Sequence, residues 1–81
     1  MTDKQKTQLI AKLEDVIYSY NMAVYQANNG EIDNIITPLS VLTDVYATIS
    51  IMIPTIVLEF DEIGIHHPVK SFIIDGVKYH V

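Results

Sequence analysis

The 81-residue chain contains no cysteine. Disulfide bonds therefore cannot hold its fold together, and no thiolate is available to bind a metal ion. A chain of this length forms a single small domain, residues 1–81, which buries only about 60–65% of the surface that its unfolded chain exposes. Because such a core is marginal, association with another chain is the remaining common means of stabilising it.

Arginine is also missing, and glycine is scarce. All five basic residues are lysines, so the chain lacks the planar side chain that clamps phosphates and carboxylates with two parallel hydrogen bonds. The three glycines are widely separated, which excludes a glycine-rich phosphate-binding loop. No G-x-S-x-G motif occurs, and no serine has a neighbouring base in the sequence. We therefore predict a protein that is not an enzyme, with no catalytic residues and no cofactor.

Long hydrophobic runs and an excess of positive charge are absent as well. The most apolar run, residues 45–58, has about fourteen residues and is interrupted by Pro54, whereas a bilayer span needs about twenty. The N-terminus is polar and mixed in charge, unlike a secretory signal. The formal net charge of −5 is opposite in sign to that of a typical nucleic-acid-binding protein. These features predict a cytoplasmic protein that contacts neither a membrane nor nucleic acid directly.

The chain is rich in apolar side chains, and they mark a long first helix over Asp3–Asn28. Apolar residues make up 49% of the sequence, which is more than a small monomer easily buries. Thr2 and Gln5 have the spacing of a capping box, and Asn28-Asn29-Gly30 is typical of a helix end. Between these signals, apolar residues recur at helical spacing: Leu9, Ile10, Leu13, Val16, Ile17, Tyr20, Ala23, Val24 and Ala27.

The second half of this helix carries another apolar row. Tyr18, Met22 and Tyr25 are spaced i, i+4, i+7 and lie roughly opposite the first stripe. A helix that is apolar on two sides must cover both, and an 81-residue chain can cover one with its own core. We predict that the row contacts another chain, most simply a second copy in a dimer. The alternative is that the tyrosines lie on the surface with their hydroxyls in water.

A second helix is predicted over Pro38–Ser50. Thr37 has the residue type of an N-cap, and Pro38 suits the first helical position because its missing N–H has no partner there. The β-branched residues of Ile49–Ile53 leave open whether this segment ends the helix or starts a strand. Pro54 closes the segment in either case.

The C-terminal half has the alternation of β-strands. Thr55–Asp61 alternates, with Ile56, Leu58 and Phe60 predicted to share one face. Asp75-Gly76 is typical of a two-residue type I′ turn. In the register that follows, Ile74 faces Val77 and Phe72 faces Tyr79 on an apolar face, whereas Ile73 faces Lys78 and Ser71 faces His80 on the other, mostly polar face.

Together these elements predict an α+β fold, in which two N-terminal helices pack on one face of a small three-stranded antiparallel sheet formed by the C-terminal half. The last strand, Val77–Val81, has little sequence left to cover it, so it could pair across a dimer.

The histidines are the one set of residues that suggests a metal. His66 or His67 could approach Asp61 and His80, but adjacent histidines in an extended loop point apart, so only one of the pair would ligate. We therefore expect loop and surface histidines and no metal site.

An acidic surface is predicted from five carboxylates: Glu31, Asp33, Glu59, Asp61 and Glu62. The leading functional hypothesis is a small acidic, non-enzymatic protein-binding or regulatory module that acts as a homo-oligomer. One alternative is an inhibitor of the kind that phages and other mobile elements encode, which would use this surface to block a basic nucleic-acid-binding site on a host protein. Another is a small-molecule binder with its site between subunits.

Overall fold

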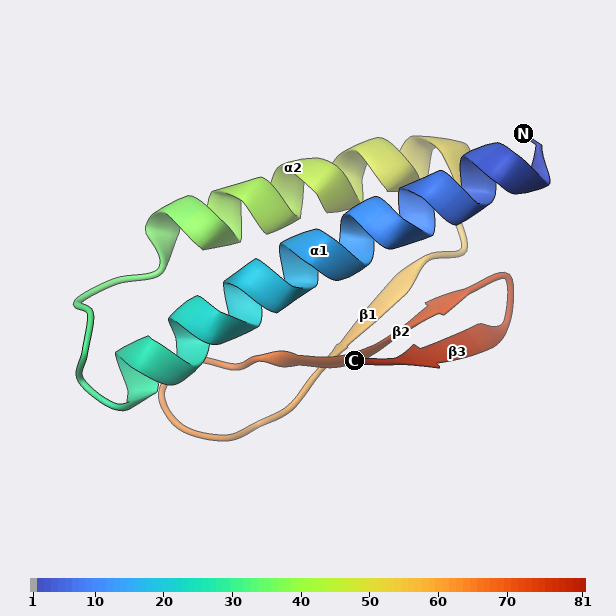
Figure 1. Cartoon of the computed structure of the whole chain (residues 1–81). Coiled ribbons are helices and arrows are strands. Elements are labelled where there is room, and N and C mark those ends of the chain that lie inside the picture. The colour runs from blue at the N-terminus through green and yellow to red at the C-terminus, as the bar shows by residue number, and fades with distance from the viewer. Residues whose placement is uncertain (1) are drawn as a thin grey trace.

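Two antiparallel helices lie on one side of a three-stranded antiparallel sheet (Figure 1). The computed structural model describes residues 2–81. The elements in chain order are α1 (Asp3–Asn28), α2 (Ile36–Met52), β1 (Val57–Phe60), β2 (Val69–Ile74) and β3 (Val77–His80). The predicted α+β class, with helices from the first half and a sheet from the second, is confirmed.

Helix α1 sets the length of the molecule. Its 26 residues extend about 39 Å at 1.5 Å per residue, close to the 42 Å long axis. The predicted capping box is present: Thr2 Oγ1 accepts a hydrogen bond from the Gln5 N–H at 3.2 Å, and Gln5 Oε1 accepts one from the Thr2 N–H at 3.0 Å. The helix ends at Asn28, and Gly30 adopts a φ of 77°. Both predicted ends are therefore confirmed.

Helix α2 is longer than predicted at both ends. It begins at Ile36, so the assignment of Thr37 as N-cap is wrong, and Thr37 and Pro38 lie inside the first turn. Proline is tolerated there because the first-turn N–H groups have no acceptor within the helix. Asn34 Oδ1 instead accepts a hydrogen bond from the Ile36 N–H at 3.3 Å. At the other end the helix continues to Met52, so the ambiguous segment is almost entirely helical.

The hairpin of β2 and β3 has the predicted register throughout. Asp75 and Gly76 both have positive φ, 51° and 79°, as a type I′ turn requires. The paired residues are Ile74 with Val77, Ile73 with Lys78, Phe72 with Tyr79, and Ser71 with His80. A two-residue turn of the right residue types was therefore enough to fix the pairing.

Strand β1 is shorter than the predicted Thr55–Asp61, and its end differs from the predicted pattern. The register with β2 shifts between Glu59 and Phe60, which marks an irregularity of the β-bulge type. Phe60 is 42% exposed, yet it lines one groove together with Ile56 and Leu58, so the predicted shared face is kept while Phe60 itself is not buried. The extra residue of the irregularity is Lys70 of β2, because Glu59 pairs with Ser71 and Phe60 pairs with Val69.

The core lies between the helices and the sheet. Phe72 is fully buried, and its ring stacks on Tyr79 with centroids 5.1 Å apart and planes 8° from parallel. The buried hydrophobic residues come from both helices, the sheet and the segments joining them: Leu13, Ile17, Tyr20, Val24, Ile35, Leu42, Ile49, Ile53, Ile56, Val69, Phe72 and Ile74. Within residues 2–81, every buried side-chain polar atom has a hydrogen-bond partner.

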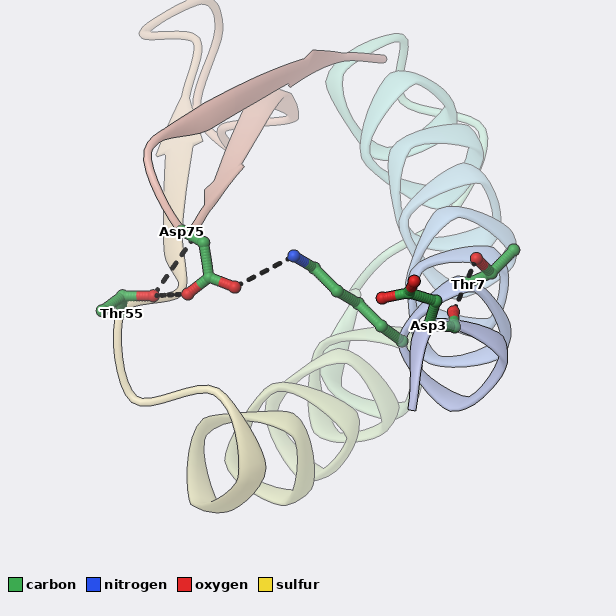
Figure 2. Close-up of polar contacts among 5 residues, drawn as sticks. Asp3, Thr7, Thr55 and Asp75 are labelled. Atoms are coloured by element: carbon green, nitrogen blue, oxygen red, sulfur yellow. Dashed lines mark hydrogen bonds and ion pairs between the residues drawn. The ribbon is translucent and has the colours of Figure 1, made fainter. Parts of the chain in front are cut away.

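Asp75 joins the hairpin turn to the helical layer. Figure 2 shows its carboxylate between Thr55 and a side chain of α1. Lys6 Nζ lies 3.0 Å from Asp75 Oδ2, and Thr55 Oγ1 donates to Asp75 Oδ1 at 2.9 Å. The hydrogen bond from Lys6, followed by the one from Thr55, holds the pKa of Asp75 below its ordinary value. Hydrogen bonds from Ser71 and then Lys78 likewise lower the pKa of Glu59.

These two carboxylates predict a loss of stability in acid. A carboxyl group whose folded-state pKa is lowered contributes stability above its unfolded pKa and loses it as the pH falls through the folded value. The free energy of unfolding should therefore decrease from about pH 5 to pH 3, and Asp75→Asn should flatten that decrease. Urea unfolding followed by circular dichroism across this range measures both slopes. An Asp75→Asn slope equal to that of the wild type would contradict the prediction.

Candidate functional site

The predicted interface row lies on the surface of α1. Tyr18, Met22 and Tyr25 are 66%, 45% and 46% exposed. The same helix buries the centre of another stripe, where Leu13 and Ile17 are fully buried. Helix α1 is therefore apolar on two sides, and the chain's own core covers one of them.

A shallow depression of about 300 Å³ adjoins this row. It lies between α1 and three parts of the sheet: the residue after β1, the start of β2 and the residue after β3. Besides the row itself, it is lined by Asn21, Asp61, Pro68, Val69, Lys70 and Val81. We call the row and this depression together the α1 surface. This surface therefore combines two phenol rings and a methionine with one lysine and one carboxylate.

Asn21, in the middle of α1, holds the backbone that lines the depression in place. Asn21 Nδ2 donates to the Val69 carbonyl, and the Val69 N–H donates to Asn21 Oδ1, both at 2.8 Å. Asn28 forms the same pair of bonds with the backbone of His66, each at 3.0 Å. Each amide side chain bonds to both the N–H and the carbonyl of one residue, as the backbone of a neighbouring strand would. The two asparagines thereby hold the segment that leads into β2 against the helix.

Sequence reasoning missed both of these contacts. Asn28 was interpreted only as part of a helix end, and Asn21 was assigned no role. The available signal was the position of Asn21, since asparagine is a poor former of helix interiors and usually needs a hydrogen-bonding reason to be there. Tyr20 adds a third contact, with its hydroxyl donating to the His67 carbonyl at 2.8 Å. Burial raises the pKa of that hydroxyl.

The five predicted acidic residues are distributed over three places. Glu31 and Asp33 lie in the α1–α2 loop and Glu62 in the β1–β2 loop, and Figure 1 shows both loops at the end of the molecule where α1 ends. Asp61 lines the α1 surface. Glu59 lies on the sheet, where Ser71 Oγ donates to it at 2.6 Å and Lys78 Nζ lies 3.0 Å away. Glu31, Asp33 and Glu62 therefore belong to two loops at the same end of the molecule, which we call the acidic end.

The histidines do not converge on one point. His66 and His67 lie in the loop before β2, whereas His80 is on β3, opposite Ser71. Across residues 2–81, no three side chains of the metal-binding types are grouped so that they could hold an ion.

Helix α2 leaves more apolar surface uncovered than sequence reasoning anticipated. Asp44 is its only charged residue among 17, yet only Leu42 and Ile49 are buried. A groove of about 360 Å³ runs between α2 and β1, and we call it the α2–β1 groove. It is lined by Leu39, Leu42, Thr43, Tyr46, Ile56, Val57, Leu58 and Phe60. The near absence of charge over residues 36–58 was the signal that could have predicted this surface.

The chain was compared with protein-family models, with curated proteins and with solved structures, and no match was found in any of the three comparisons. Neither helix in the described part of the chain combines the length and apolar character needed to cross a membrane.

Proposed function

We propose that this chain is a non-enzymatic protein-binding module that associates with a second copy of itself through the α1 surface. The observation that carries the proposal is the row of three large, exposed side chains on a helix whose other stripe packs into the chain's own core. Tyrosine and methionine are enriched at protein interfaces, because they bury a large area with few polar atoms to satisfy.

Charge supports a second copy as the partner of this surface. The chain carries a net charge of −5, so two copies repel each other unless they meet where acidic groups are few. The interface row itself is uncharged. In a two-fold dimer each residue of one patch faces the same patch of the partner, so an uncharged row meets an uncharged row.

Sedimentation of the wild type and of a double variant, Tyr18→Glu with Tyr25→Glu, tests the proposal. The wild type should sediment as a dimer at micromolar concentration, and the variant should be a folded monomer. Losing two anchor residues and adding like charges should raise the dissociation constant by at least about 100-fold.

Ile65→Glu provides a matched control, because Ile65 is an exposed apolar residue (85%) in the β1–β2 loop, outside the row. It should dimerise as the wild type does. A wild type that sediments as a monomer, or a double variant that still dimerises, would contradict dimerisation through the α1 surface.

A second candidate function follows from the acidic end. Glu31, Asp33 and Glu62 gather there, and no lysine occurs between Lys12 and Lys70. Such a surface would suit an inhibitor that occupies the basic nucleic-acid-binding site of another protein, as some mobile elements encode. The rate at which this chain associates with such a basic partner should fall steeply as the salt concentration rises. The double variant Glu31→Gln, Asp33→Gln should associate more slowly still. Salt-independent binding would count against this function.

A further inference from the structure

We propose that β1 accepts an extended peptide of a partner protein as a fourth strand of the sheet, with the peptide's apolar side chains in the α2–β1 groove and its basic side chains directed toward Glu62 and the acidic end. This surface lies apart from the α1 surface, so the inference goes beyond the proposed function. The partner is defined by its chemistry: an extended segment in which apolar residues alternate with lysine or arginine.

The first observation is that β1 is the less protected edge of the sheet. Within residues 2–81, β1 pairs with β2 only, so its other side presents backbone donors and acceptors that a further strand can use. Proteins commonly protect such edges with lysine or proline. The opposite edge, β3, carries Lys78. Strand β1 has neither residue type. Its one charged residue, Glu59, is bound to Ser71 and to Lys78, so the same ion pair also engages the lysine of β3.

The second observation is the shape and chemistry of the groove beside that edge. Tyr46 donates a long hydrogen bond of 3.4 Å to the Ile56 carbonyl, which links α2 to the segment entering β1. Apart from Thr43 and the Tyr46 hydroxyl, the side chains that line the groove are hydrocarbon. In a strand added to β1, every second side chain would face the helical layer and enter the groove. The four residues of β1 extend about 13 Å, enough to contact about two such side chains.

The third observation is the charge around the groove. The segment that forms both of its walls and continues past β1, residues 36–62, has four charged residues, all acidic. Three of them are engaged elsewhere: Asp44 lines a depression with Lys12, Asp61 lines the α1 surface, and Glu59 is bound to Lys78. The fourth is Glu62. Phe60 also lines a second depression together with Ile35 and Glu62, so the groove opens toward the acidic end. A basic peptide is attracted there. A second copy carries the same net charge of −5 and has no lysine between positions 12 and 70, so its β1 cannot supply the basic side chains that this peptide has.

The test uses defined peptides and the full chain. The probe is a fluorescent heptapeptide of sequence KVKIKVK, compared with EVEIEVE and with two forms of the basic peptide methylated at alternate backbone nitrogens, one for each register. The basic peptide should bind at least about tenfold more tightly than the acidic one. One methylated form should lose binding, because strand addition needs its backbone N–H groups. Backbone amides of β1 should become protected from hydrogen exchange.

Matched variants on the two edge strands show which edge of the sheet binds the peptide. Val57 on β1 and Val77 on β3 are similarly exposed, at 48% and 53%. Val57→Lys should weaken binding of the basic peptide by at least about tenfold through charge and lost apolar contact, and Val77→Lys should leave it unchanged. Phe60→Lys, at an exposed position of the same groove, gives a second variant should Val57→Lys fold poorly.

Any of these results with peptide would overturn the proposal: no binding of the basic peptide, equal binding of the acidic peptide, full binding by both methylated forms, or protection of β3 amides instead of β1 amides. Protection of β1 that rises with protein concentration in the absence of peptide would also overturn it, because a second copy would then be the occupant. The monomeric Tyr18→Glu, Tyr25→Glu variant should bind the peptide as the wild type does, so failure of either proposal is recognised separately.

Discussion

Replacing Asn21 with leucine should destabilise the fold by about 2–5 kcal/mol, although leucine has a similar size and a higher helix propensity. The change removes both partners of Val69, whose N–H and carbonyl each bond to the Asn21 amide at 2.8 Å. Val69 is only 2% exposed, so water cannot readily replace these bonds. Each buried backbone group left without a partner costs about 1–3 kcal/mol. Urea unfolding of the variant and the wild type at neutral pH measures the difference.

Asn28→Leu is the matched control for this experiment. Asn28 makes the same two bonds to the backbone of His66, but that contact is only partly buried. Water can hydrogen-bond to the released groups, so the expected loss is about 1 kcal/mol. Equal losses for the two variants would show that burial of the Val69 backbone does not determine the effect.

Phe72→Ala should be the most destabilising single truncation in the sheet. Removing a fully buried phenylalanine typically costs about 3–5 kcal/mol, which combines lost burial with the cavity that remains. A domain of this size has a total stability of about 4–12 kcal/mol, at 0.05–0.15 kcal/mol per residue. The variant should therefore be partly unfolded at 37 °C. It would also leave Tyr79 without the ring on which it stacks at 5.1 Å.

Phe60→Ala gives the comparison for that truncation. Phe60 follows the β-bulge and is 42% exposed, so its removal should cost less than about 1 kcal/mol. Thermal unfolding followed by circular dichroism ranks the two variants. A larger loss for Phe60→Ala than for Phe72→Ala would mean that the centre of the core lies at the β1 edge rather than on β2.

The elements that sequence reasoning placed correctly are those specified by neighbouring residues. The capping box of Thr2 and Gln5 fixed the start of α1, and Asp75-Gly76 fixed the turn and register of the hairpin. In both cases the interacting groups lie within a few residues of each other, so their spacing alone carries the information. The fold class followed from these local signals together with the alternation of the strands.

The features that were missed depend on contacts between distant segments. Thr37 has the residue type of a cap, but the helix starts one residue earlier, where Asn34 supplies the acceptor. The bulge after Glu59 comes from pairing with β2, which the sequence of β1 does not reveal. Asn21 meets Val69 across 48 positions of the chain.

The candidate interface row was located from sequence because its helical spacing is local. Its exposure could not be established in this way, since exposure depends on which side of α1 the sheet covers. The α2–β1 groove was missed for the same reason. Its walls come from two elements, and only their packing shows that the apolar side chains between them remain uncovered.

The loop before β2 is held to α1 by main-chain atoms of His66, His67 and Val69, and none of these bonds involves the side chains of the two histidines. The identity of positions 66 and 67 is therefore largely independent of the path that the loop follows. Two adjacent residues at one end of the molecule can be exchanged while their backbone stays in place, which makes them suitable positions for grafting a new binding determinant onto this small scaffold.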